Sequence, residues 1–514
     1  MRSESEPLPA TQSVCPVCLR PLPATIEEQG QDAYLVKYCP EHGKFRSVIW
    51  RGNPGQELSR WSRPKIPSRP RVPATPVERG CPLDCGLCPD HRQHTCTALL
   101  EITWRCNLSC PVCFASAGGP ARPELTLPEV ERMLRGVMRM SGPCNIQFSG
   151  GEPSLHHDLA ALVALAKDMG FPFVQLNTNG LRAAREADFA PQIAQAGLDS
   201  VFLQFDSHRE QPYRTLRGQP LLQEKLLAVE RFVTAGIGVV LVPTVVPGVN
   251  DQDLGGLLRL AARLSPGVRG IHFQPVSYFG RFPAPPEDQA RITLPEIMRG
   301  LEEQTRGLVH AQDFLPPACE HARCSFHANY LVNQDQSLTL LSEQRACCSG
   351  KVEPILAREG ADQSKAFVSR QWRAPSGCDC QAEQGHETFP ANKDAATLLP
   401  MAPTHDAAPV REPAAAVPPA SANGTAWTPP ENASTEALPL DDLDRFLARA
   451  STHRLAVSAM AFQDAWTLDL DRLRGCCIHV ATPEGRLIPF CAYNLTAADG
   501  RPLYRETHGI PSLA

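Results

Sequence analysis

Cysteines in short, regular spacings are the most distinctive feature of this 514-residue sequence. Cys106, Cys110 and Cys113 lie so close together that one loop can present three thiolates to one side. Such a loop can hold three corners of a [4Fe–4S] cube and leave the fourth iron open to a small molecule. A zinc knuckle is the alternative, although zinc would need a fourth cysteine or histidine nearby.

A second motif follows the next predicted strand, where residues 149–153 read Ser-Gly-Gly-Glu-Pro. Gly150 and Gly151 allow a backbone to approach a ligand closely. The carboxylate of Glu152, which precedes Pro153, offers an acceptor for an ammonium group. A plain turn is the alternative for any one glycine pair, but the two motifs together are more specific than either alone.

An upstream group repeats the spacing of the first and has a fourth thiol close by. Its members are Cys81, Cys85, Cys88 and Cys96. This group does not follow a strand and does not precede the Gly-Gly-Glu-Pro motif. We therefore expect it to form a closed auxiliary [4Fe–4S] cluster. The alternatives are His91 or His94 as a ligand, and zinc as the metal.

Two further ligand sets lie near the ends of the chain. The N-terminal set is Cys15, Cys18, Cys39 and His42, and it resembles a zinc ribbon or a rubredoxin-like knuckle that binds zinc or a mononuclear iron. The late set, predicted as a second auxiliary cluster, is Cys319, Cys324, Cys477 and Cys491. The remaining late cysteines are interpreted as free thiols.

Short apolar strands alternate with amphipathic helices through the middle of the chain. The predicted strands are Leu99–Thr103, Ile146–Ser149, Phe173–Asn177, Val201–Phe205, Val239–Val245 and Ile271–Gln274. The predicted helices are Leu127–Met140, Asp158–Met169, Leu221–Ala235 and Asp253–Leu264. This alternation predicts parallel strands joined by crossover helices. We expect an α/β fold, a partial or full (β/α) barrel with its chemistry in the loops after the strands.

Composition divides the chain into five regions. They are a metal knuckle at 1–60, a linker with an auxiliary Fe–S segment at 61–98, the barrel at 99–330, a polar insert at 331–437, and a cluster-binding extension at 438–514. Nine prolines between Pro400 and Leu440, among many alanines, predict that the insert is largely disordered.

The overall composition excludes some classes of partner. Lysine plus arginine number 50 and aspartate plus glutamate 55, which gives a formal net charge of −5 and no basic block for a nucleic acid. No apolar run approaches the roughly 18 residues of a membrane span, and the first residues do not read as a signal peptide. We expect a cytoplasmic protein, since tight cysteine pairs in a reducing compartment bind metals.

On these motifs the chain resembles the radical S-adenosylmethionine (SAM) superfamily, over roughly residues 97–285. In that superfamily three cysteines hold the cluster, SAM binds the fourth iron, and a Gly-Gly-Glu-Pro turn meets the SAM amino group. The resemblance implies further SAM contacts from Asn177, Gln204 and Thr244. Val112 departs from the aromatic residue that many members carry, but it keeps the apolar character.

Residues 80–108 and 460–494 resemble a narrower group, which contains tetraether lipid synthases and 7,8-dihydro-6-hydroxymethylpterin dimethyltransferases. Members carry a radical SAM cluster, auxiliary [4Fe–4S] clusters and a rubredoxin-like N-terminal site. The Pro/Ala-rich insert is a departure from the group, and it leaves a lipid-like and a pterin-like substrate both open.

The resemblance implies an enzyme that generates a 5′-deoxyadenosyl radical for C–H activation, followed by C–C bond formation or C-methylation. It also implies a one-electron reductant such as a ferredoxin or a flavodoxin. The alternative is a non-enzymatic multi-metal scaffold or an electron-transfer protein, which would not need the Gly-Gly-Glu-Pro motif or the barrel.

Overall fold

The computed structural model describes residues 10–52, 58, 61–118, 123–342, 354–375 and 442–505. The Pro/Ala-rich segment and four of the late thiols lie outside these residues, namely Cys347, Cys348, Cys378 and Cys380. The chain divides into two compact units, Met1–Ser376 with Arg449–Ala514, and Gly377–Ala448. All strands of the described residues belong to the first unit.

A 12-stranded sheet forms the centre of the first unit. Its parallel strands follow the order β17, β6, β7, β8, β9, β10, β12 and β16. Antiparallel strands extend both edges, β13 and β14 beyond β16, and β18 beyond β17. The edge strands β14 and β18 do not pair with each other in the described residues, so the sheet is a partial (β/α) barrel. The predicted α/β fold class is confirmed.

The strands of this sheet are short and mostly buried. They are β6 (Thr97–Thr103), β7 (Asn145–Gly150), β8 (Val174–Thr178), β9 (Ser200–Gln204), β10 (Gly238–Val242), β11 (Thr244–Val245), β12 (Val268–Pro275), β13 (Ser325–Val332), β14 (Leu338–Leu340), β16 (Arg454–Met460), β17 (Ile478–Ala481) and β18 (Leu487–Pro489). Every residue of β6 is buried, as expected for a parallel strand that is covered on both faces.

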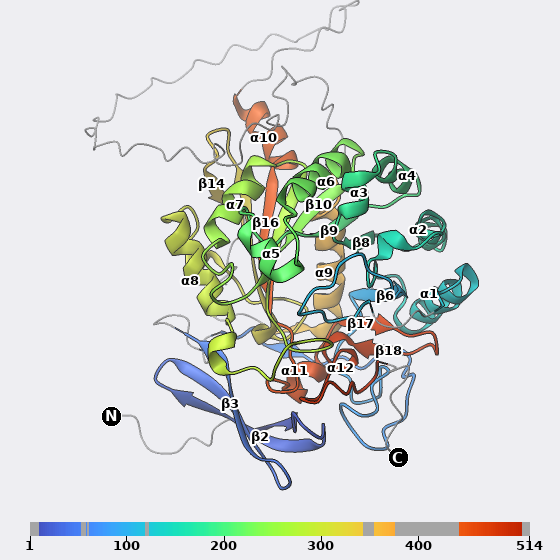
Figure 1. The fold of residues 1–514 in the computed structure, drawn as a ribbon, viewed down its shortest axis with the longest axis vertical. Helices are drawn as coiled ribbons and strands as arrows, with labels where there is room; N and C mark the ends of the chain where they lie inside the picture. The colour runs from blue at the N-terminus through green and yellow to red at the C-terminus, as the bar shows by residue number, and fades with distance from the viewer. Residues whose placement is uncertain are drawn as a thin grey trace, which may run out of the picture. The chain divides into compact units, whose positions relative to one another are not determined.

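Helices lie around the outside of the sheet (Figure 1). They are α1 (Leu127–Ser141), α2 (Leu159–Asp168), α3 (Leu181–Arg185), α4 (Phe189–Gln195), α5 (Gln211–Arg217), α6 (Leu222–Thr234), α7 (Leu254–Arg263) and α8 (Leu294–Thr305). Thr126 and Glu129 form a capping box at the start of α1, which explains why this helix begins where the sequence predicts. The strands and helices predicted for residues 99–274 are all present, with small shifts at their ends.

The C-terminal segment is part of the barrel sheet. The sequence predicted residues 438–514 as an extension separate from the barrel. β16 pairs in parallel with β12, and β17 pairs in parallel with β6. Two short helices complete this segment, α11 (Leu470–Arg474) and α12 (Phe490–Tyr493). The sheet therefore extends beyond the predicted range of 99–330.

The beginning of the predicted insert is also structured. Residues 355–371 form β15 (Ile355–Leu356) and helix α9 (Ala357–Gln371), and β15 pairs with β5 (Lys65–Ile66). The helix packs closely through Gly360, where an added Cβ would lie 2.4 Å from the carbonyl oxygen of Ala318. This close packing of small residues gave no periodic apolar signal, so the sequence reading assigned the segment to the insert.

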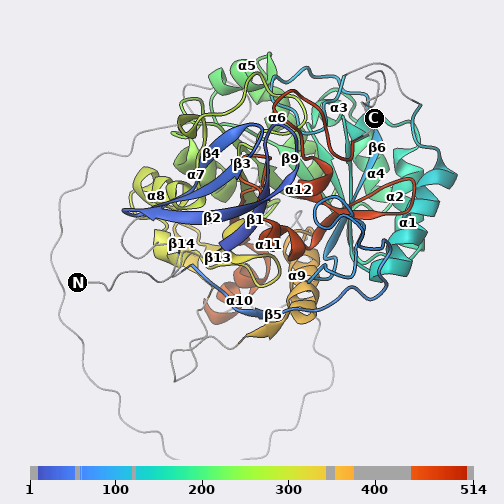
Figure 2. The same ribbon diagram turned by 90° about the horizontal axis from the view of Figure 1, so that it is seen from below.

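The N-terminal residues form a separate antiparallel sheet. Its strands are β1 (Ala10–Val14), β2 (Pro21–Gln29), β3 (Asp32–Cys39) and β4 (Gly43–Arg51), paired in chain order. Figure 2 shows this sheet in front of the C-terminal helices α11 and α12. The buried ammonium group of Lys37 donates hydrogen bonds to Ser13 Oγ at 2.9 Å and to the carbonyl oxygen of Ala465 at 2.7 Å, so it ties this sheet to the C-terminal segment.

The helices of the described residues include none that is both long enough and apolar enough to cross a bilayer.

A buried ion pair joins the C-terminal segment to the loop before α8. The Arg291 guanidinium donates two hydrogen bonds to the carboxylate of Asp464, at 2.8 and 3.1 Å, and both side chains are buried. The backbone N–H of Tyr278 donates to the same carboxylate at 3.0 Å.

We predict that Asp464→Asn lowers the free energy of unfolding by about 3–5 kcal/mol, because it leaves the Arg291 charge buried and unpaired. Urea denaturation followed by circular dichroism measures this. Glu131→Gln, which removes the exposed pair with Arg135 on α1, should change it by less than about 1 kcal/mol. Equal effects of the two substitutions would contradict the assignment.

Candidate active site and metal centres

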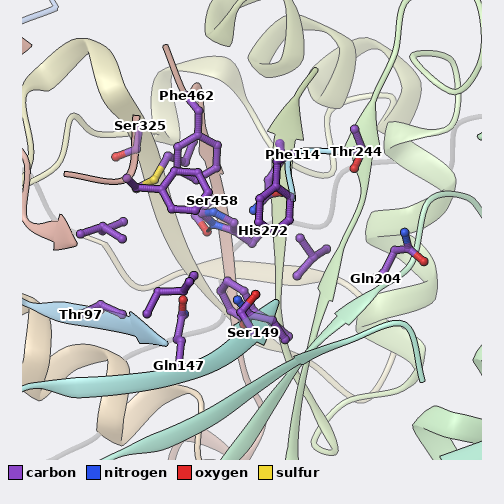
Figure 3. A pocket seen from close by; sticks show the side chains of 18 of the residues that line it. Thr97, Phe114, Gln147, Ser149, Gln204, Thr244, His272, Ser325, Ser458 and Phe462 are labelled. Atoms are coloured by element: carbon purple, nitrogen blue, oxygen red, sulfur yellow. Dashed lines mark hydrogen bonds between the residues drawn. The ribbon is translucent and has the colours of Figure 1, made fainter. Parts of the chain in front are cut away.

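One large cavity inside the barrel brings together the loop of Cys106, Cys110 and Cys113, residues 150–152, and Asn177, Gln204 and Thr244. Its volume is about 580 Å³, and strands β6–β10, β12, β13, β16 and β17 all contribute to its lining. Figure 3 shows Thr97 and Ser325 on one side of this cavity, Gln204 and Thr244 on the other, and His272 with Ser458 between them. Two separate groups of cysteines line it.

The first group is Cys106, Cys110 and Cys113, in the loop that follows β6. Arg281 holds this loop, since its guanidinium donates hydrogen bonds to the carbonyl oxygens of Cys110 at 3.0 Å and Ala117 at 2.8 Å. Burial raises the pKa of Cys106 to about 11, and the negative charge of Glu152 adds to this. The thiol is therefore protonated at neutral pH until a metal displaces the proton.

The predicted glycine motif packs against the cysteine loop. A Cβ on Gly150 would lie 2.2 Å from the carbonyl oxygen of Thr103, and one on Gly151 would lie 2.2 Å from that of Arg105. Both distances are far inside van der Waals contact, so only glycine fits. The close approach that the glycines allow is thus to the chain's own backbone, and it fixes the loop that carries the thiols.

Glu152 joins the ends of two strands. Its carboxylate accepts hydrogen bonds from Thr178 Oγ1 at 2.6 Å, from the backbone N–H of Asn179 at 2.7 Å and from that of Ser154 at 3.1 Å. The side chain is buried but still lines the cavity. Pro153 is buried beside it and begins a short 3-10 helix (Pro153–Leu155).

The other residues predicted to contact SAM, Asn177, Gln204 and Thr244, also line the cavity. Gln204 Oε1 accepts a hydrogen bond from Lys225 Nζ at 3.0 Å, and Thr244 Oγ1 accepts one from Arg217 Nη2 at 3.2 Å. The buried Oδ1 of Asn177 has no hydrogen-bond partner among the described residues.

Two buried cations that contact Gln204 and Thr244 were not predicted from the sequence. Arg217 lies on the cavity and makes two hydrogen bonds of 2.7 Å to the carboxylate of Asp206. Burial opposes its charge, but Asp206 raises the pKa of Arg217 above its usual value. Burial lowers the pKa of Lys225 to about 8, against the attraction of Asp206. No sequence motif marks either residue, because α5 and α6 bring them to the strand ends only in the folded chain.

These features fit a three-cysteine [4Fe–4S] cluster with SAM. The loop supplies three thiols, the chain's own backbone holds it rigidly, and the adjoining cavity has room and an unpartnered amide oxygen at Asn177. The donor set matches the thiolate ligation that such clusters require.

The second group of cysteines in the cavity differs from the predicted groupings. Cys96, Cys319 and Cys477 are all buried, and their sulfurs lie within 4.8 Å of one another. The backbone N–H of Cys96 donates to the carbonyl oxygen of Cys477 at 2.8 Å, because β6 and β17 begin side by side. The sequence reading grouped Cys96 with its neighbours in the chain, whereas strand pairing brings it to residues hundreds of positions away.

The other thiols of the predicted auxiliary groups lie apart from this trio. Cys81, Cys85 and Cys88 lie in a loop held by Asp84, whose carboxylate accepts three backbone hydrogen bonds, and by Tyr504, whose hydroxyl accepts a hydrogen bond from the Cys85 N–H at 2.9 Å. Interaction with the neighbouring Cys85 thiol lowers the pKa of Cys81.

Cys324 and Cys491 do not join Cys319 and Cys477 in the converging group. Instead, the buried guanidinium of Arg472 donates two hydrogen bonds of 3.4 Å to the sulfur of Cys324. The sulfur of Cys491 accepts a hydrogen bond from the backbone N–H of Gln463 at 3.3 Å.

The four N-terminal ligands converge as predicted. Cys15, Cys18, Cys39 and His42 place their ligand atoms within 4.8 Å of one another, at the β1–β2 and β3–β4 turns of the N-terminal sheet. Although burial opposes it, the contact with His42 lowers the pKa of Cys39 to about 6. This is the donor set of a tetrahedral structural metal site.

Comparisons with known proteins agree with this geometry. Residues 100–261 match the radical SAM superfamily, and residues 7–51 match the HMPTM N-terminal zinc ribbon domain. The chain is 35% identical to the 7,8-dihydro-6-hydroxymethylpterin dimethyltransferase of Methanocaldococcus jannaschii, over 94% of this chain and 93% of that protein. It is also 31% identical to the GTP 3′,8-cyclase of Heliobacterium modesticaldum, over 34% of this chain and 54% of that one.

The site and the matched core define a radical SAM enzyme, a class that uses a [4Fe–4S] cluster and SAM. Within this class, the chain belongs to the family of the M. jannaschii pterin dimethyltransferase. The non-enzymatic alternative from the sequence reading is therefore set aside.

Among solved structures, the chain resembles Streptococcus suis SuiB bound to S-adenosylmethionine, with a TM-score of 0.36 and 14% identity over 42% of this chain and 48% of that chain.

We predict that Gly151→Ala weakens SAM binding at least about tenfold, because the added methyl displaces the cysteine loop by steric overlap with Arg105. Equilibrium dialysis of the anaerobically reconstituted protein measures this. Gly136→Ala, in the interior of α1 where an added Cβ meets nothing closer than 3.8 Å, is the control and should bind SAM normally. Normal SAM binding by Gly151→Ala would refute the packing role of the motif.

Proposed function

We propose that this enzyme methylates a small pterin-like molecule by radical chemistry. Two observations support the proposal. The relative that spans almost the whole chain is a pterin dimethyltransferase, and a single cavity of about 580 Å³ adjoins the cysteine loop. That volume is typical of small-molecule sites.

In this proposal Cys106, Cys110 and Cys113 hold the catalytic cluster, and residues 150–152 with Asn177, Gln204 and Thr244 form the SAM site. When bound, the cluster and SAM supply a 5′-deoxyadenosyl radical that removes a hydrogen atom from an unactivated C–H bond. The chain contributes orientation and the exclusion of water. Arg217 holds Thr244 at the start of β11, and Lys225 holds Gln204 at the end of β9, each through a hydrogen bond.

The middle of the cavity supplies the features that a planar, polar heteroaromatic ring needs. Phe202, His272 and Trp372 pack together, with ring centroids 4.8–6.4 Å apart, and all three line the cavity. Burial lowers the pKa of His272 to about 4, so this ring is neutral at physiological pH and its Nδ1 lies 2.8 Å from Ser458 Oγ. An aromatic surface beside neutral polar groups favours a neutral ring over a charged one.

A pterin-like substrate is favoured over a lipid-like one by the polar groups in this part of the cavity. Gln147 and His272 line it, and within the protein each uses only part of its hydrogen-bonding capacity, in the contacts with Gln175 and Ser458. Burial against an alkyl chain would leave their remaining groups unsatisfied. The proposed outcome is accordingly C-methylation, with the added carbon supplied by a one-carbon donor, rather than coupling of two lipid chains.

Further metal centres belong to the proposal. The converging trio Cys96, Cys319 and Cys477 is the best-formed candidate for an auxiliary [4Fe–4S] cluster. Cys81, Cys85 and Cys88 are candidates for a second one. Cys15, Cys18, Cys39 and His42 would bind one zinc or iron. A one-electron reductant such as a ferredoxin or a flavodoxin would supply the electrons.

The proposed function is tested by Cys110→Ala. We predict that this variant loses about four irons per chain and forms no 5′-deoxyadenosine when incubated anaerobically with SAM and dithionite. Iron analysis and chromatography of the nucleoside measure these two outcomes. Val112→Ala in the same loop lines the cavity but offers no ligand, so it should keep both iron and activity. Deoxyadenosine from Cys110→Ala would refute the assignment.

The auxiliary trio is tested by Cys477→Ala. We predict the loss of about four irons, with 5′-deoxyadenosine still formed, because the catalytic loop and the SAM site stay intact. Ile478→Val, at the neighbouring cavity position, is the control and should keep its full iron content. Unchanged iron in Cys477→Ala would rule out a cluster at this trio.

A further inference from the structure

A second, surface pocket has four cationic side chains in its lining. It has a volume of about 610 Å³, and it lies between the residues before β6 and helix α9. Its charged lining consists of Arg69, Arg71, Arg358, Lys365 and one carboxylate, Asp362. The carboxylate is already paired with Lys365, at 2.7 Å.

The guanidinium groups of Arg69, Arg71 and Arg358 have neither a carboxylate nor a hydrogen-bond partner among the described residues, and all three residues are exposed. The whole chain carries a formal charge of −5, so this concentration of positive charge runs against the overall sign. Such a patch attracts an anionic partner and speeds its encounter.

The pocket lies directly behind the auxiliary trio. Helix α9 separates the two: Arg358, Asp362 and Lys365 line the pocket, while Ala361 packs in the same buried cluster as Cys96, Cys319 and Cys477. A helix with its side chains is about 10 Å across, so the wall between the surface and the thiols is one helix thick.

Hydrogen bonds outside α9 also connect the pocket to the trio. His94 lines the pocket, and its backbone N–H donates to Gln93 Oε1 at 2.7 Å. The Nε2 of Gln93 donates in turn to the carbonyl oxygen of Cys319 at 2.6 Å. His94 is also only two residues from Cys96, so the pocket connects to the trio through both covalent bonds and hydrogen bonds.

We propose that this pocket, with Arg69, Arg71 and Arg358, is the docking surface of an acidic ferredoxin that delivers electrons to the centre behind α9. The ferredoxin gives up one electron and becomes oxidised, that centre gains the electron, and no proton or covalent bond is exchanged. The inference rests on the proposed auxiliary cluster for its purpose, but the docking itself is measured separately.

The test measures the binding of an acidic plant-type [2Fe–2S] ferredoxin to the reconstituted holoenzyme by isothermal titration calorimetry. We expect binding that weakens steeply as salt is raised, since the contacts are between charges. The variant R69E/R71E/R358E should bind at least about tenfold more weakly. The matched control R185E/R214E/R306E reverses three exposed arginines elsewhere and should bind like the natural chain.

Stopped-flow reduction gives the second readout. Ferredoxin-driven bleaching of the iron–sulfur absorbance should slow at least about tenfold in R69E/R71E/R358E, while dithionite, which needs no docking surface, should reduce both proteins equally. Unchanged binding and unchanged ferredoxin-driven reduction in this variant would overturn the proposal.

The pocket could instead bind a small anion, and the test distinguishes this outcome from the docking of a protein. Arginine-dependent binding of inorganic pyrophosphate, without any binding of ferredoxin, would also overturn the proposal. If dithionite yields no 5′-deoxyadenosine from the natural chain, the proposed function fails, whereas the calorimetry still decides the docking.

Discussion

Parallel pairing between β6 and β17 is the constraint on which the arrangement of thiols depends. The register sets Thr97 opposite Ile478 and continues to Leu100 opposite Ala481. It therefore places Cys96 and Cys477 side by side, although they are far apart in the chain. The same β6 strand, about 23 Å long at seven residues, leads into the loop of Cys106, Cys110 and Cys113. A set of three cysteines therefore lies near each end of β6, and both sets line the same cavity.

Buried charges with fixed partners hold the loops around this cavity. Glu152 accepts hydrogen bonds from the end of β8, Asp206 pairs with Arg217, and Glu101 pairs with Arg505 from the C-terminal segment. Buried pairs of this kind add little net stability but are costly to break, so they favour one arrangement of the loops over others. For a site that must hold a reactive species away from water, a single rigid arrangement is what the chemistry requires.

Local patterns in the sequence predicted most of the barrel and the contacts within single loops. The motif at 149–153, the strand–helix alternation and the four N-terminal ligands each depend on residues close together in the chain. The position of Cys477 beside Cys96 could not be predicted in this way, because it depends on the pairing of β6 with β17 across more than 370 residues. Arg217 was missed for a related reason, since its role arises only when α5 folds against the end of β9. The role of α9 was hidden by its small residues, Gly360 and Ala361, which pack tightly without forming an apolar stripe.

Diffraction at the iron absorption edge from anaerobically reconstituted crystals tests the central claim most directly, because anomalous peaks locate iron without reference to activity. We predict one cluster on Cys106, Cys110 and Cys113, with no fourth protein ligand, after the end of β6. We predict another on Cys96, Cys319 and Cys477, at the start of β6. This prediction would be contradicted if the cluster on the Cys106–Cys113 loop had four protein ligands, or if neither set of three cysteines held iron.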